Sequence, residues 1–186
     1  MNSWRLSRLE HPRSQRSTKE YPRQSHNLLA DMTGAHAISS HQQRVEAAFA
    51  RVHNAGLEAE LLADYSKYLC VLVAGFIEKS FAEMMLEHAR RCGSPSLQRY
   101  VEQNTSKFTN ANCAKIGQLL GAFDPTWRIQ IEAYLVDERK AAVDSIYSLR
   151  NNIAHGVSVG VTYASVRQYF AKVCDVVSFA KNLVIP

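Results

Sequence analysis

The stretch that decides the fold reads Tyr68-Leu69-Cys70-Val71-Leu72-Val73-Ala74-Gly75-Phe76-Ile77-Glu78. No residue before the final glutamate is charged, and a helix that is apolar on every side is buried on every side. The run therefore predicts the central helix of a bundle, extending from about residue 57 to a stop at Gly93-Ser94-Pro95. Glu78 closes the run, and a carboxylate there needs a cation or hydrogen-bond donors to satisfy it.

Helical patterns lie on both sides of this run. A shorter helix is expected before it, capped by Ser39 or Ser40 and ending near Gly56. After it, the spacing of apolar residues predicts helices over residues 96–108, 110–123, 127–155 with a break near 135–137, and 163–184. Residues 157–162 alternate like a strand, but no second strand is available to pair with them, so we expect a loop. The predicted fold class is all-α.

Length and composition predict one folded domain and one tail. A chain of 186 residues with 46% apolar content can bury a substantial core, which we place in residues 39–186. Residues 1–38 are rich in Arg, Ser, Gln and His and have no sustained periodicity, so we expect a disordered tail. They carry +3 of the net charge of +5. Such a tail can attract polyanions without sequence preference, or remain solvated and do nothing specific.

Several classes of function find no support in the sequence. The four cysteines show no C-x-x-C spacing, so we expect reduced, buried thiols and no metal site. Neither a phosphate-binding glycine loop nor a dinucleotide fingerprint is present, so no cofactor is expected. There is no apolar run of about 18 residues and no secretory signal pattern, so we expect a cytoplasmic protein that does not engage a membrane.

The residues best suited to chemistry lie at the end of the helix predicted to finish near residue 155. There, Ser148-Leu149-Arg150-Asn151-Asn152-Ile153-Ala154-His155-Gly156 pairs a permanent cation with a titratable imidazole, and glycine is the natural residue just past a helix end. On a helical wheel Arg150 falls inside the apolar stripe, whereas Tyr147, Asn151 and His155 fall on the polar side. Arg150 and His155 therefore point about 140° apart on an ideal helix.

Each of these two residues has a structural and a functional interpretation. Arg150 can form a buried ion pair, with Glu78 as the obvious partner, or bind phosphate through bidentate hydrogen bonds. His155 can bond the last carbonyls of its helix, or act as a proton donor and acceptor near neutral pH. The two side chains can meet over one ligand if the helix end unwinds, if the arginine curls round, or if a second copy of the chain contributes.

The segment Arg150-Asn151-Asn152-Ile153-Ala154-His155 resembles the R-x4–6-H signature of HEPN domains, all-α bundles found in many prokaryotic defence and toxin systems. Tyr147-Ser148-Leu149 before it and Gly156 after it fit as well, and the run over residues 68–78 is similar to the RiboL-PSP-HEPN branch. The resemblance covers about residues 40–186.

This resemblance implies a metal-independent endoribonuclease that acts as a homodimer on RNA, serving as a toxin or as an antiviral, abortive-infection effector with an antitoxin or defence partner. His155 would transfer the proton, Arg150 would stabilise the transition-state phosphate, and Asn151 would orient the imidazole or a phosphate oxygen. Glu78 would hold Arg150, with Asn152 and Tyr147 as further supporting residues.

Two other functions remain open at this point. The domain can be a non-catalytic helical module that dimerises and binds RNA or a partner protein. It can also be the nucleotide-modified member of a toxin–antitoxin pair, with Tyr147 or Tyr163 as the acceptor, since both tyrosines lie close to the motif.

Overall fold

The computed structural model describes residues 26–185, with side chains described from Gly34 onward, and within these residues it contains helices and no strand. The all-α prediction is confirmed. The helices are α1 (His26–Asn54), α2 (Ala59–Cys92), α3 (Pro95–Thr105), α4 (Cys113–Phe123), α5 (Pro125–Tyr134), α6 (Asp137–Ala154) and α7 (Tyr163–Val184). None of the helices in this part of the chain is both long enough and apolar enough to cross a membrane.

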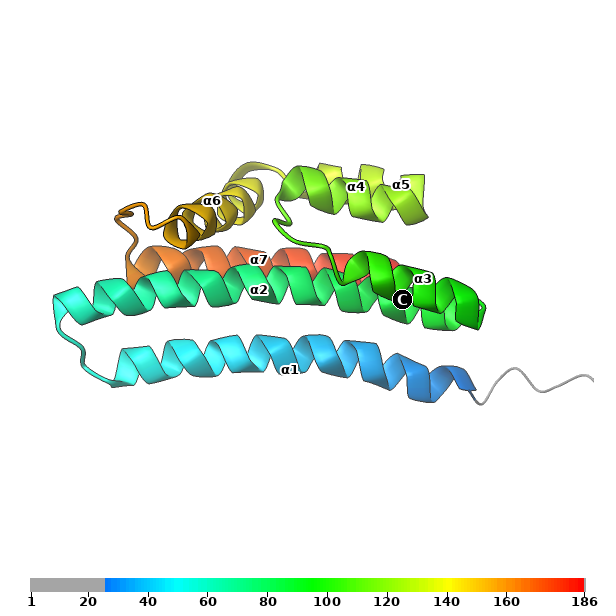
Figure 1. Ribbon diagram of the computed structural model, residues 1–186, viewed down its shortest axis with the longest axis horizontal. Coiled ribbons are helices and arrows are strands. Elements are labelled where there is room, and N and C mark those ends of the chain that lie inside the picture. Colours follow the sequence, from blue (N-terminus) through cyan, green and yellow to red (C-terminus); the bar gives the residue numbers. More distant parts are fainter. Residues whose placement is uncertain (1–25, 186) are drawn as a thin grey trace, which may run out of the picture.

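The long helix α2 lies at the centre of the bundle (Figure 1). It pairs with α1 on one side and with α7 and α6 on the other, while α3, α4 and α5 gather towards its C-terminal end. Its inward side chains are completely removed from solvent, and they include Leu69, Val73, Phe81, Met84 and Met85. Burial of side chains of this size is the main favourable contribution to folding.

Short polar residues set the helix boundaries. The side chains of Ser94, Asn112 and Asp124 each accept a hydrogen bond from a backbone N–H in the first turn of α3, α4 and α5, respectively. Thr162 and Ser165 form a capping box at the start of α7, in which each side chain bonds to the backbone of the other. The break expected near residues 135–137 is confirmed, since α5 ends at Tyr134 and α6 begins at Asp137.

Two expectations about the fold were wrong in part. The first helix begins at His26 rather than near Ser39, and Ile38 is buried, so the second part of the proposed tail is helical. Residues 1–25 lie outside the described residues, and the division into tail and domain stays a prediction there. The apolar run of α2 is not buried all round either: Tyr68 is 51% exposed and Val71 is 40% exposed. The side of α2 that carries these two residues is therefore partly exposed.

Candidate functional site

The C-terminal end of α6 is tightly terminated. The Val157 N–H donates to the Asn152 carbonyl at 2.9 Å and the Gly156 N–H donates to the Ile153 carbonyl at 3.1 Å, which is the Schellman arrangement. Gly156 has φ +69°, the left-handed conformation that this ending requires. Gly156 therefore occupies the position expected from the sequence, and His155 is the residue that caps a helix regular up to Ala154.

Arg150 lies one turn earlier and is partly buried. Its guanidinium donates to the side-chain oxygen of Asn110 at 3.3 Å and to that of Asn151 at 3.2 Å. Both acceptors are neutral amides. Within the described residues Arg150 forms no ion pair with a carboxylate, so its guanidinium is oriented by neutral groups. A guanidinium in this state can bind an anion such as a phosphodiester.

Asn110 connects Arg150 to Glu78. The backbone N–H of Asn110 donates to a Glu78 carboxylate oxygen at 2.7 Å, while its side chain accepts from Arg150. The expected direct ion pair between Glu78 and Arg150 is not formed, because Asn110 stands between the two charged groups. Asn110 has φ +54°, which asparagine tolerates better than most residues.

The sequence-based interpretation missed Asn110. It was predicted to begin the helix over residues 110–123, whereas α4 begins at Cys113, and its one local signal is that asparagine tolerates left-handed turns. That signal says nothing of a partner on α6, 40 residues further along the chain.

Tyr147 packs into the core rather than lying on the polar side of α6. It is 3% exposed, and its hydroxyl donates to the Ala74 carbonyl at 3.2 Å. Burial raises the pKa of this phenol above its ordinary value, and the nearby Glu78 carboxylate adds to the effect. The placement on the polar side was therefore wrong. The Tyr147 hydroxyl links α6 to α2, and its burial argues against a role as a modification acceptor.

Tyr163, the other proposed acceptor, is partly buried. Its hydroxyl donates to the Phe49 carbonyl at 3.2 Å and accepts a hydrogen bond from Arg167 at 3.0 Å. Both hydrogen-bonding functions of this hydroxyl are already used within the bundle.

The remaining motif residues are divided between two places. The Asn151 side chain contacts Arg150, and Asn152 contributes its carbonyl to the helix ending. The His155 side chain is exposed, and no hydrogen bond joins it to any described residue. The structure therefore brings together Glu78, Asn110, Arg150 and Asn151, which we call the Arg150 cluster, and leaves the imidazole of His155 outside it.

The cysteines match the expectation of free thiols, although not all are buried. Burial raises the pKa of Cys70 to about 11 and that of Cys113 to about 12, so both are inert thiols near neutral pH. Cys92 is exposed. In the part of the chain that the structure describes, no three His, Cys, Asp or Glu side chains converge as a group that could hold a metal ion.

The fold and the Arg150–His155 helix end together define a HEPN-type domain. The family model RiboL-PSP-HEPN matches residues 37–185, a span that includes the Arg150 cluster and His155. The chain belongs to this family. No curated protein and no solved structure matches it.

Proposed function

We propose that the protein is a metal-independent endoribonuclease that works as a homodimer. The observation that carries the proposal is the position of Arg150: its guanidinium forms no ion pair with a described residue, is held by two amide oxygens and lies one helical turn before an exposed histidine. Membership of the RiboL-PSP-HEPN family supports the same activity.

In the proposed reaction the 2′-oxygen of a ribose attacks the adjacent phosphorus, and the bond from phosphorus to the 5′-oxygen breaks. The products are a 2′,3′-cyclic phosphate and a 5′-hydroxyl. His155 takes the proton from the 2′-hydroxyl or gives one to the leaving 5′-oxygen, since imidazole can do either near neutral pH. Arg150 binds the equatorial phosphate oxygens, whose negative charge increases in the transition state. Asn151 keeps the guanidinium aligned through the contact at 3.2 Å.

A second copy of the chain would bring an arginine and a histidine together, since a single copy keeps Arg150 and His155 apart. Because α6 is regular up to Ala154, the helix end does not unwind to bring His155 round to Arg150. In a two-fold dimer, each of two composite sites can take its arginine from one protomer and its histidine from the other.

An uncovered apolar surface on α2 fits such a dimer. Leu61, Tyr65, Tyr68 and Val71 are between 40% and 52% exposed, with Tyr65 and Tyr68 also lining a small pocket against α1. Gly75, four residues after Val71, falls on the same side of the helix. We call this surface the α2 stripe. A Cβ added at Gly75 would meet no atom within 4 Å, so a second helix can approach closely there. The stripe ends one turn before Glu78, so a partner seated on it would lie beside the Arg150 cluster.

The test uses the purified full chain and end-labelled single-stranded RNA in EDTA. We expect wild-type protein to produce 2′,3′-cyclic phosphate ends, and we expect His155→Ala and Arg150→Ala to lose cleavage by about 100-fold or more, the scale usual for a proton-transfer or charge-stabilising group. Matched controls are His36→Ala and Arg44→Ala, two exposed residues of α1 away from the motif.

Undiminished cleavage by both motif variants would show that the activity is a contaminant and would end the proposal. Loss of growth on expression of wild-type protein, absent for His155→Ala, would support a toxin or anti-phage role. A growth defect that persists in His155→Ala would favour the non-catalytic binding module instead.

A further inference from the structure

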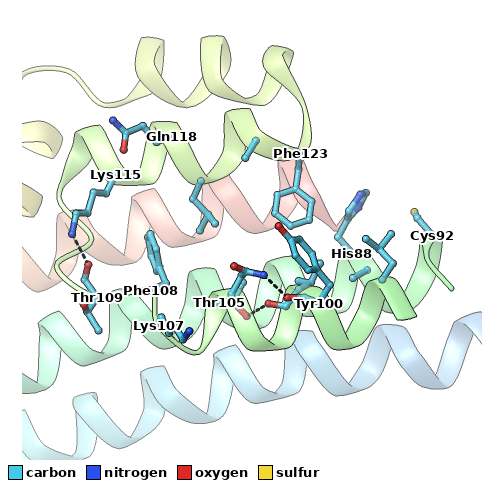
Figure 2. A pocket seen from close by; sticks show the side chains of 16 residues that line it. His88, Cys92, Tyr100, Thr105, Lys107, Phe108, Thr109, Lys115, Gln118 and Phe123 are labelled. Atoms are coloured by element: carbon cyan, nitrogen blue, oxygen red, sulfur yellow. Dashed lines mark hydrogen bonds between the residues drawn. The ribbon is translucent and has the colours of Figure 1, made fainter. Parts of the chain in front are cut away.

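A groove with a volume of about 790 Å³ lies between α3 and α4 (Figure 2). Its walls are largely apolar and aromatic. Tyr100 on α3 is 65% exposed, and Phe108 and Phe123 line the same space. His88, from α2, lies at the end farthest from the loop that follows α3. We call this cavity the α3–α4 groove.

The lysine side chains that line the groove give it a positive charge. Its lining contains Lys107 and Lys115 and neither aspartate nor glutamate. Lys115 donates to the Thr109 carbonyl at 3.1 Å, and neither lysine forms an ion pair with a described residue. Figure 2 shows Lys115 and Thr109 together at the end of the groove that faces away from His88. Apolar aromatic walls with a cationic end suit a flat aromatic ligand that carries negative charge.

The cationic end of the groove adjoins the Arg150 cluster through the backbone. Thr109 lines the groove, and the next residue, Asn110, contacts both Arg150 and Glu78. Consecutive Cα atoms are about 3.8 Å apart, so the loop that closes the groove is the same loop that positions the guanidinium. If a phosphate of an RNA strand lies at Arg150, a neighbouring nucleotide of the same strand can therefore reach this groove.

We propose that the α3–α4 groove binds an unpaired nucleobase of a single-stranded RNA, next to the phosphodiester held at Arg150. This inference rests on the proposed ribonuclease function. The base stacks on Tyr100, and the backbone of the strand runs from there past Lys107 and Lys115 towards Arg150. Sequence-specific recognition of RNA generally uses unstacked bases placed on aromatic side chains. Among the groups lining the groove, the Gln118 amide can read the edge of a base, and so can the amide oxygen of Asn104, whose NH2 group donates to the Tyr100 carbonyl at 2.7 Å.

The test measures binding separately from chemistry. The probe is a fluorescein-labelled pool of short, random-sequence 2′-O-methyl RNA strands, which cannot be cleaved because the attacking hydroxyl is blocked. Fluorescence anisotropy gives the Kd for wild type, Tyr100→Ala, Tyr100→Phe and His155→Ala. Ile129→Ala is the matched control, because Ile129 is 68% exposed on α5 and outside the groove.

We expect Tyr100→Ala to raise the Kd about tenfold, the loss typical of one base–aromatic stack. Tyr100→Phe keeps the ring and should restore binding, and Ile129→Ala should bind like wild type. His155→Ala should bind normally while losing cleavage. On cleavable RNA, Tyr100→Ala should raise KM with little change in kcat, as expected for a contact that is equal in the ground state and the transition state.

Unchanged RNA binding by Tyr100→Ala, together with loss of cleavage by His155→Ala, would overturn the groove assignment and leave the ribonuclease proposal intact. Loss of RNA binding by Tyr100→Ala while His155→Ala cleaves like wild type would overturn the ribonuclease proposal and support the groove as an RNA site. If an acidic amphipathic peptide fills the groove without displacing the RNA probe, the groove is a protein-docking site and the inference fails.

Discussion

The Arg150 guanidinium donates a hydrogen bond to the side chain of Asn110, 40 residues earlier in the chain, at a distance of 3.3 Å. The loop after α3 thus takes part in orienting the one motif cation that faces the bundle. Because the same asparagine donates its backbone N–H to Glu78, the three residues form one unit that links α2, the loop and α6.

Asn110→Gly separates the two roles of this asparagine. Glycine keeps the left-handed backbone at φ +54° but removes the side-chain acceptor for Arg150. We expect cleavage to fall about tenfold with little loss of stability. Asn110→Ala should in addition lose up to about 1–2 kcal/mol of unfolding free energy, because alanine lacks the short polar side chain that lets asparagine tolerate this conformation. RNA cleavage and urea unfolding of both variants provide the measurement, and full activity in Asn110→Gly would contradict the role proposed for this contact.

Glu78 should matter more for structure than for charge balance. Its carboxylate accepts a 2.7 Å hydrogen bond from the Asn110 backbone, so Glu78→Ala should cost about 1–3 kcal/mol of unfolding free energy. Glu78→Gln keeps an acceptor oxygen and should cost less. Urea unfolding checks the order, with the exposed Glu102→Ala as the control. Equal stability of the alanine and glutamine variants would mean that the hydrogen bond contributes nothing.

Two glycines near the motif form a matched pair. At both Gly156 and Gly160 an added Cβ would meet no atom within 4 Å, but only Gly156 has a positive φ. Gly156→Ala should therefore lose about 1–2 kcal/mol of stability through backbone strain, and cleavage should fall because the cap at His155 is disturbed. Gly160→Ala should be close to neutral. Thermal unfolding and cleavage of the two variants decide the point, and equal effects at both positions would argue against the helix ending as the cause.

The α2 stripe gives a direct test of the dimer. Gly75→Arg places a large cation where a Cβ meets nothing in the monomer, so the fold should persist while self-association is lost. The control is Ala133→Arg, an exposed position on α5. Sedimentation equilibrium should show a dimer for wild type and the control, and a monomer with no cleavage for Gly75→Arg. A fully active monomer would remove the need for a composite site.

Stability should decline on mild acidification. Burial lowers the pKa of His88, an effect that the nearby Asp124 carboxylate partly opposes, and burial lowers the pKa of His41 as well. Below the ordinary histidine pKa of about 6.5 the unfolded chain binds more protons than the folded chain, so the unfolding free energy falls as the pH falls. His88→Gln should reduce this decline between about pH 7 and pH 5, and urea unfolding at both values measures it. An unchanged slope would mean that His88 titrates alike in both states.

The helices could be predicted from the sequence because the patterns that indicate a helix are local. Apolar spacing predicted α7 over residues 163–184 as observed, and the break before Asp137 was visible as an interruption in the pattern. The family was recognisable for the same reason, since its motif occupies six consecutive residues at one helix end.

The contacts within the Arg150 cluster could not be predicted from local sequence patterns. A helical wheel placed Tyr147 on the polar side because it treats each helix alone, whereas the neighbouring α2 supplies the Ala74 carbonyl that the phenol needs. Likewise, Glu78 was assigned to the right neighbourhood but to the wrong partner. Only the fold shows that the residue between the two charges is Asn110, which lies on neither helix.

The connection from α6 to α7 begins directly after His155, and hydrogen bonds fix it at both ends. The Schellman ending at Gly156 fixes its start, and the capping box at Thr162 fixes its end. Because the backbone that follows His155 is fixed at two places, the imidazole can move mainly by rotation about its own side-chain bonds. The backbone at His155 would then need no reorganisation when a substrate binds. The binding free energy of the substrate would therefore remain available for aligning the phosphodiester.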